Sequence, residues 1–209
     1  MRKPNLILFG PGGHAHSCID VIEQLDSFKI AGLISAGEGL QNECMGYRII
    51  GKDNDLPELA KQYEHALITV GQIESARVRE RIYNQALALG FKFPTIISGS
   101  AHVARGALVG DGTIVMHGAI VNANAKVGNN CIINTKALIE HDATVADHCH
   151  ISTGAIINGA ASVGSGSFVG SGSVIKQGIV LGSRCVIGMG VSVRHHHAEN
   201  SRILTSNKL

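Results

Sequence analysis

The 209-residue sequence contains little of what marks proteins that bind nucleic acids or membranes. Charged residues make up only 16% of the chain, the formal net charge is +2, and Lys and Arg form no long basic run. Scattered positive charge of this kind argues against nucleic acid or a membrane surface as a partner. The first apolar run, Leu6–Phe9, is too short for a signal sequence or a spanning helix, so we expect a cytoplasmic protein.

The cysteines also lack the spacing of a zinc site or a disulfide framework. The sequence has five of them, an odd number, and no two form a C-x-x-C pair. Three fall on the small-residue position of the repeat described next, which predicts reduced side chains in a protein core. These three are Cys131, Cys149 and Cys185.

The most regular feature is an aliphatic residue at every sixth position over residues 97–193. A mostly small residue follows each aliphatic residue four positions later. A six-residue period fits neither a helix nor a simple alternating strand, but it fits a parallel β-helix in which one hexad forms one side of a coil. Three hexads per coil predict about five stacked coils. The aliphatic residues are Ile97, Val103, Val109, Val115, Val121, Val127, Ile133, Ile139, Val145, Ile151, Ile157, Val163, Val169, Ile175, Leu181, Ile187 and Val193.

The residues before this repeat alternate between predicted strands and predicted helices. Short apolar runs predict strands over residues 6–9, 30–34 and 66–70, and helical spacing of apolar residues predicts helices over 17–25, 55–63 and 75–89. This order predicts a small Rossmann-like parallel α/β sheet with flanking helices. A proline after Phe91-Lys92-Phe93 marks the junction. We therefore predict domains over residues 1–94 and 95–193, followed by a tail over 194–209.

The first predicted strand ends in a glycine loop that could bind phosphate. In the loop, Gly10-Pro11-Gly12-Gly13-His14, backbone N–H groups at the start of a helix could approach a phosphate group. NAD is not expected, because the second strand ends in Ile34-Ser35-Ala36 without the acidic residue that binds its ribose. A turn that only packs the helix against the strand remains the alternative.

Together these motifs resemble the NeuD/PglD family of bacterial sugar acetyltransferases, within the hexapeptide-repeat acyltransferase superfamily. The resemblance is carried by Phe9–His14, by Ile133–Asp142, and by Ile151–Gly154 with Val163–Gly170. It implies a left-handed β-helix and a homotrimer with active sites between subunits. It also implies acetyl-CoA as the donor and no metal.

The resemblance implies an acetyl-CoA-dependent N-acetyltransferase acting on a nucleotide-linked amino sugar of the 4-amino-4,6-dideoxy type, in bacterial surface-glycan synthesis. A separate phosphate-binding domain favours this acceptor. O-acetylation of sialic acid remains open within the family, and a non-catalytic binding solenoid remains open outside it. A zinc hydratase of the γ-carbonic-anhydrase type shares the β-helix, but it needs two histidines five residues apart. No pair has that spacing among His102, His117, His141, His148 and His150.

Acetyl transfer needs a base for the acceptor's proton, and histidine titrates closest to neutral pH. His141 lies between Glu140 and Asp142, and a carboxylate bound to an imidazole raises its basicity. The resemblance implies that His141 is the base, that Asp142 assists it, and that His150 lies near the acyl donor. Half a coil separates the two histidines, so we expect them to meet only around a corner or across a subunit interface. His148 is expected to face solvent.

The resemblance also implies two groups of binding residues. Those for the acceptor are Gly10, Gly12, Gly13 and His14, and those for CoA are Gly159, Gly170, Ser171 and Met189. Ser35 stands where relatives that bind UDP-sugars commonly have Asp, so the sequence does not determine which nucleotide the acceptor sugar carries. Three consecutive histidines, residues 195–197, lack a carboxylate partner for a metal, and we expect a solvated tail that leans on the CoA phosphate.

Overall fold

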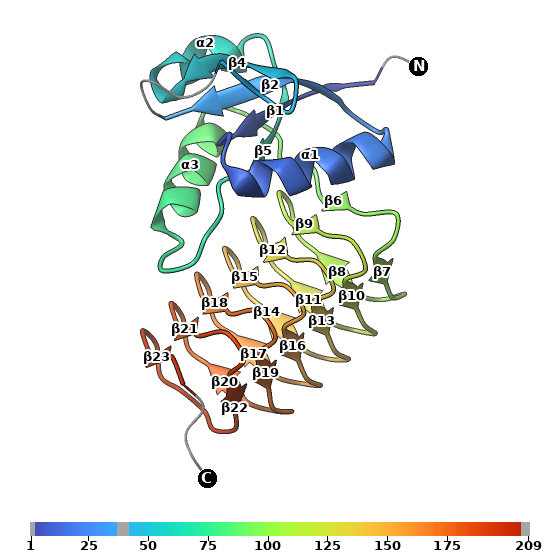
Figure 1. The fold of residues 1–209 in the computed structure, drawn as a ribbon, viewed down its shortest axis with the longest axis vertical. Helices are drawn as coiled ribbons and strands as arrows, with labels where there is room; N and C mark the ends of the chain where they lie inside the picture. The colour runs from blue at the N-terminus through green and yellow to red at the C-terminus, as the bar shows by residue number, and fades with distance from the viewer. Residues whose placement is uncertain (1–2, 37–41, 206–209) are drawn as a thin grey trace.

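A computed structural model of the chain describes residues 3–36 and 42–205. An α/β domain lies at one end of the long axis and a column of stacked coils forms the rest (Figure 1). Helix α1 lies between the sheet and the first coils (Figure 1).

The α/β domain has a five-stranded sheet of order β3-β4-β2-β1-β5. Its strands are parallel except β3, which pairs antiparallel with β4. The three predicted strands and three predicted helices are confirmed, whereas the β3–β4 hairpin was not predicted. The strands are β1 (Asn5–Phe9), β2 (Lys29–Ser35), β3 (Glu43–Cys44), β4 (Tyr47–Lys52) and β5 (His65–Ile68), and the helices are α1 (Gly13–Leu25), α2 (Leu56–Ala60) and α3 (Arg77–Ala88), with a short 3₁₀ turn at Asp53–Asp55.

The repeat forms a parallel β-helix with one two-residue strand per hexad. Strands one coil apart pair in register, as Ile133 does with Ile151, 18 residues later in the chain. The strands are β6 (Ile96–Ile97), β7 (His102–Val103), β8 (Leu108–Val109), β9 (Ile114–Val115), β10 (Ile120–Val121), β11 (Lys126–Val127), β12 (Ile132–Ile133), β13 (Leu138–Ile139), β14 (Thr144–Val145), β15 (His150–Ile151), β16 (Ile156–Ile157), β17 (Ser162–Val163), β18 (Phe168–Val169), β19 (Val174–Ile175), β20 (Val180–Leu181), β21 (Val186–Ile187) and β22 (Ser192–Val193).

The strands build three flat faces, each named here after its first strand. The β6 face has the order β6-β9-β12-β15-β18-β21-β23, the β7 face runs from β7 to β22, and the β8 face runs from β8 to β20. The second residue of each strand points inward and forms one continuous apolar core. The five cysteines are free and buried, which confirms reduced core side chains. Inside the coils, for example, the Cys149 thiol donates to the Gly164 carbonyl at 3.2 Å.

The α/β domain covers the amino-terminal half of the β6 face. The outward side chains Ile114 and Ile132 are fully buried and pack in one cluster with Ile19 and Ile22 of α1. Burying this much apolar surface joins the two parts of the chain firmly. The contact also places the glycine loop, at the start of α1, beside the next strands of the same face.

The last described residues continue the β-helix. Strand β23 (Arg202–Ile203) pairs with β21, and His197 forms a bridge with Leu181. Ile187 pairs with Ile203, a separation of 16 residues, so this final coil is two residues shorter than the others. The expected tail is therefore ordered on the coils over residues 197–203, while Ala198, Glu199, Asn200 and Arg202 stay exposed to solvent.

Candidate active site

His141 and Asp142 form a hydrogen-bonded pair at the turn between the β7 and β8 faces. Nδ1 of His141 lies 2.9 Å from Oδ2 of Asp142, and both side chains are about half exposed. Hydrogen bonds from His141 and Asn124 lower the pKa of Asp142, which is therefore ionised at neutral pH. An ionised carboxylate only accepts, so Nδ1 carries the proton and Nε2 is left with a lone pair. This is the arrangement of a general base.

Two asparagines from the preceding coil hold this turn in place, and sequence reasoning missed both. Asn122 donates to Oε2 of Glu140 at 3.0 Å, and Asn124 donates to Oδ1 of Asp142 at 3.3 Å. Oε2 of Glu140 also accepts the backbone N–H of His141 at 3.1 Å. The available signal was their position, one coil of 18 residues before Glu140 and Asp142.

Of the four residues predicted to bind CoA, Gly159 adjoins the proposed base. A Cβ at Gly159 would lie 2.6 Å from Cε1 and 2.7 Å from Nε2 of His141. The other three lie at a different corner, between the β6 and β7 faces. There the Gly170 backbone packs on Met189, and Ser171 Oγ lies 2.9 Å from Ser152 Oγ. Met189 is 80% exposed.

His150 lies on the β6 face, where the α/β domain buries it to 7% exposure. Its Nδ1 donates to the Gln72 carbonyl at 2.6 Å, and its Nε2 accepts from Asn134 at 3.1 Å. Burial lowers the pKa of His150 to about 4, so it is neutral at physiological pH. Both ring nitrogens are bound to protein groups in this structure. A role near the thioester stays a prediction.

The structure places His150 beside His14, not beside His141. The imidazole centroids of His14 and His150 are 6.4 Å apart. His141 lies at a corner that borders the other two faces, as the half-coil spacing predicted. Within one chain, the predicted acceptor-binding histidine therefore neighbours the second catalytic candidate, while the proposed base lies elsewhere.

The glycine loop lies at the carboxyl end of β1, the edge where parallel sheets bind ligands. Gly10 has φ +105° and a Cβ there would collide with Val70, so the fold requires this glycine. At Gly12 and Gly13 a Cβ would meet no atom within 4 Å. The start of α1 has no side-chain cap and no acidic residue in its first turn. Open space at a helix amino terminus without a side-chain cap suits an anion.

A buried arginine that sequence reasoning missed connects the two parts of the chain. Arg79 of α3 is 1% exposed. Its guanidinium donates to the carbonyls of Ile68 and Val70 at 2.9 and 2.7 Å, and to Oδ1 of Asn130 in the β-helix at 2.7 Å. Its charge adds to burial in lowering the pKa of His14, to about 3. A charged side chain on a predicted helix gave no sign of this burial.

His148 differs from its prediction. It is partly buried, its Nδ1 lies 3.0 Å from the Asn130 amide nitrogen, and its ring packs edge-on against Tyr83 at 5.5 Å. The expected solvent-facing histidine is instead part of the contact between α3 and the coils.

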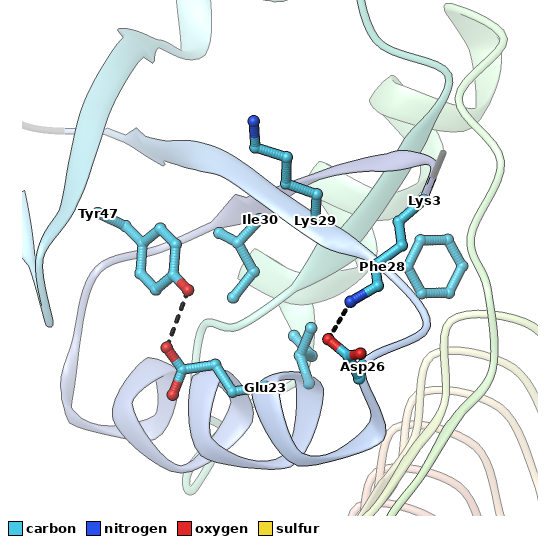
Figure 2. A pocket seen from close by; sticks show the side chains of 8 residues that line it. Lys3, Glu23, Asp26, Phe28, Lys29, Ile30 and Tyr47 are labelled. Atoms are coloured by element: carbon cyan, nitrogen blue, oxygen red, sulfur yellow. Dashed lines mark hydrogen bonds and ion pairs between the residues drawn. The ribbon is translucent and has the colours of Figure 1, made fainter. Parts of the chain in front are cut away.

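A cavity of about 750 Å³ opens at the far side of the α/β domain (Figure 2). Its lining includes Tyr47, which donates to Glu23 at 2.8 Å, and the ion pair of Lys3 with Asp26. It borders the amino ends of β1 and β2 and contains none of the predicted site residues. The edge opposite the glycine loop is not where such sheets bind ligands.

Within residues 3–36 and 42–205, no three His, Cys, Asp or Glu side chains are grouped to hold a metal ion. No helix in the same part of the chain is long and apolar enough to cross a membrane.

Comparison with known proteins supports the class indicated by this fold. Residues 5–86 match the PglD N-terminal domain, and residues 160–194 match the hexapeptide repeat of succinyl-transferase. No curated protein matches the sequence. Among solved structures, the chain resembles perosamine N-acetyltransferase from Caulobacter crescentus, solved with one histidine replaced by asparagine and with CoA and GDP-perosamine bound. Identity is 26% and the TM-score 0.89, over 95% of this chain and 92% of that one.

Two further structures extend the comparison. The acetyltransferase domain of PglB from Neisseria gonorrhoeae, in complex with acetyl coenzyme A, is 27% identical with a TM-score of 0.87, over 96% of each chain. WeeI from Acinetobacter baumannii shares the fold, at 17% identity and a TM-score of 0.84 over 97% of each chain.

Fold and relatives together define an acyltransferase of the hexapeptide-repeat class, built on a left-handed β-helix. Within that class the chain is similar to the NeuD/PglD family, as its glycine loop and its Ile-Glu-His segment predicted, because its amino-terminal domain matches that of PglD and its whole length resembles sugar N-acetyltransferases.

Proposed function

We propose that this chain transfers the acetyl group of acetyl-CoA to the amine of a nucleotide-linked amino sugar of the 4-amino-4,6-dideoxy type. The observation that carries the proposal is the His141–Asp142 pair, whose free Nε2 can take a proton. Relatives crystallised with CoA and GDP-perosamine support the same pair of substrates. We propose that the α/β domain, predicted over residues 1–94, binds the nucleotide of the acceptor. We also propose that the reaction takes place in the cytoplasm, where the enzyme would meet both substrates.

The reaction needs one proton transfer and one acyl transfer. Nε2 of His141 accepts a proton from the sugar amine while the amine nitrogen attacks the thioester carbonyl. The carbon–sulfur bond then breaks, and the CoA sulfur leaves with the proton, giving an amide and free CoA. Asp142 stabilises the imidazolium that forms between these steps.

The β7 face supports the proposal of a homotrimer with shared active sites. Its outward side chains Ile120, Leu138, Ile156 and Val174 are apolar and incompletely buried, a surface typical of an interface. A threefold axis along this face would bring its two corners together. His141 of the partner subunit would then lie beside the corner that carries Gly170 and Met189.

Sedimentation of two matched variants tests the assembly. Leu138→Glu adds charge to the β7 face and should give an inactive monomer, whereas Thr144→Glu on the exposed β8 face should remain a trimer. A wild-type monomer with full activity would contradict shared active sites.

The activity itself is tested by thiol release from acetyl-CoA with GDP-, UDP- and dTDP-linked amino sugars and free sialic acids. An N-acetyl product survives mild alkali, whereas an O-acetyl product is hydrolysed. Turnover with an amino sugar supports the proposal. Turnover only with sialic acid would replace the acceptor, and no turnover with any of them would favour a binding solenoid.

A further inference from the structure

Cys18 lies one helical turn after His14 in α1, and the two side chains touch. Sγ of Cys18 is 3.4 Å from Nε2 of His14, as expected for residues four apart on one helix face. Cys18 is fully buried, whereas His14 is partly exposed beside the open glycine loop. The thiol therefore contacts Nε2, and Nδ1 is the ring nitrogen left for another partner.

Both groups are neutral at physiological pH. Burial raises the pKa of the Cys18 thiol to about 12. Burial, with the charge of Arg79, lowers the pKa of His14 to about 3. A thiolate–imidazolium pair is therefore not formed, and the contact is a hydrogen bond between a thiol and a neutral imidazole.

The direction of this hydrogen bond follows from the chemistry of its partners. An unprotonated imidazole nitrogen is a good acceptor, whereas thiol sulfur is a weak one. The thiol therefore donates to Nε2. A neutral imidazole carries only one ring proton, which must then be on Nδ1. In the described part of the chain, His14 Nδ1 forms no hydrogen bond to protein.

We propose that Cys18 is a positioning residue that holds His14 as the Nδ1–H tautomer, so that His14 presents a hydrogen-bond donor to the acceptor substrate. This rests on the proposed function, because it takes His14 as part of the acceptor site. The first-turn N–H groups of α1 are also donors. A site that presents only hydrogen-bond donors suits a diphosphate, because the oxygens of a diphosphate are acceptors. The proton acceptor of the reaction is then His141 alone.

The tautomer can be measured without any substrate. In wild-type protein with ¹⁵N-labelled histidine, the His14 signals, identified by their loss in His14→Asn, should show a protonated Nδ1 and an unprotonated Nε2. Cys18→Val fills the same space without a donor and should shift His14 toward the Nε2–H form. Cys18→Ser keeps a donor and should retain the wild-type tautomer. A wild-type His14 with the proton on Nε2 overturns the proposal.

Kinetic measurements distinguish whether Cys18 orients His14 or only fills space beside it. Cys18→Val should raise KM for the nucleotide-linked amino sugar about fivefold, the effect of one hydrogen bond, with kcat and KM for acetyl-CoA unchanged. The amide nitrogen of asparagine takes the place of Nδ1, so in a His14→Asn background Cys18→Val should add nothing. If Cys18→Val raises KM for the sugar equally in the wild-type and the His14→Asn backgrounds, Cys18 acts by packing and the proposal is overturned.

A third variant keeps this test separate from the proposed function. His14→Ala should raise KM for the sugar at least as much as Cys18→Val does. If KM for the sugar is unchanged in His14→Ala, His14 lies outside the acceptor site and its assignment to that site fails. The ¹⁵N spectra of His14 still decide which tautomer Cys18 favours.

Discussion

The imidazole of His141 lies against the backbone of Gly159, one coil further along the chain. A Cβ at Gly159 would come within 2.7 Å of Nε2. Gly159 does not have a left-handed φ, so its backbone does not itself require glycine. The absence of a side chain at this position leaves room for the His141 ring.

Gly159→Ala should therefore impair catalysis without impairing folding. Displacing the reacting nitrogen by about 1 Å can cost about 10²-fold in rate, so we expect kcat to fall by that order while the melting temperature stays close to wild type. Gly99→Ala is the matched control, because a Cβ there meets no atom within 4 Å. Equal kcat for both variants would contradict the packing of His141 on Gly159.

Replacing Asp142 with asparagine should reduce the basicity of His141 and leave its position intact. The pKa of Asp142 is lowered by its bonds to His141 and Asn124, so the wild-type pair carries a negative charge that the amide lacks. The loss in kcat should be smaller than in His141→Ala. Raising the pH should restore part of it, because the amine acceptor is then supplied unprotonated. Profiles of kcat against pH for the two variants check this.

Asp20 of α1 and His117 of the β-helix form a pH-dependent contact between the two parts of the chain. His117 Nε2 lies 2.7 Å from Oδ2 of Asp20, and the bond lowers the pKa of this exposed carboxyl. A lowered folded-state pKa stabilises the protein above the ordinary range near pH 4, and this contribution disappears as the pH falls through the folded-state value. Asp20→Asn should lower the melting temperature at pH 7, with a difference that vanishes once the pH falls below the folded-state pKa of Asp20. A difference in melting temperature between wild type and Asp20→Asn that does not change with pH would refute this role of the Asp20 carboxylate.

Arg79 should be the most costly single residue to remove from the contact between the two parts. Methionine would leave the carbonyls of Ile68 and Val70 and the Asn130 amide without their donor. A buried acceptor left without its donor typically costs about 1–3 kcal/mol, so denaturant unfolding should show a loss of at least that size. Arg81→Met, at an exposed position of the same helix, is the control and should change stability by less than about 0.5 kcal/mol. A similarly small change for Arg79→Met would contradict this role.

The coils could be predicted from the sequence because each hexad repeats the same local requirement. An aliphatic residue such as Ile139 must point into a narrow interior, with a small residue such as Ala143 at the turn, and the structure places both at 0% exposure. The β3–β4 hairpin has no such signal, because β4 lies near the sheet edge and most of its side chains are only partly buried.

The half-coil spacing of His141 and His150 predicted that they lie apart within one chain, but the groups that surround each of them could not be predicted from the sequence. The burial of His150 and His148 depends on which face the α/β domain covers, and the period is identical on all three faces. The support that Asn122 and Asn124 give to the turn at His141 and Asp142 comes from one coil away, so it becomes visible only when the coils are stacked.

The most direct test of the account is the turnover of His141→Ala with saturating acetyl-CoA and a nucleotide-linked amino sugar at neutral pH. The substitution leaves the inward residues Ile139 and Ala143 untouched, so the fold should persist. We expect kcat to fall about 10²–10⁴-fold, the usual cost of losing a general base, with KM for acetyl-CoA little changed. Turnover close to wild type would contradict the assignment of His141 as the base.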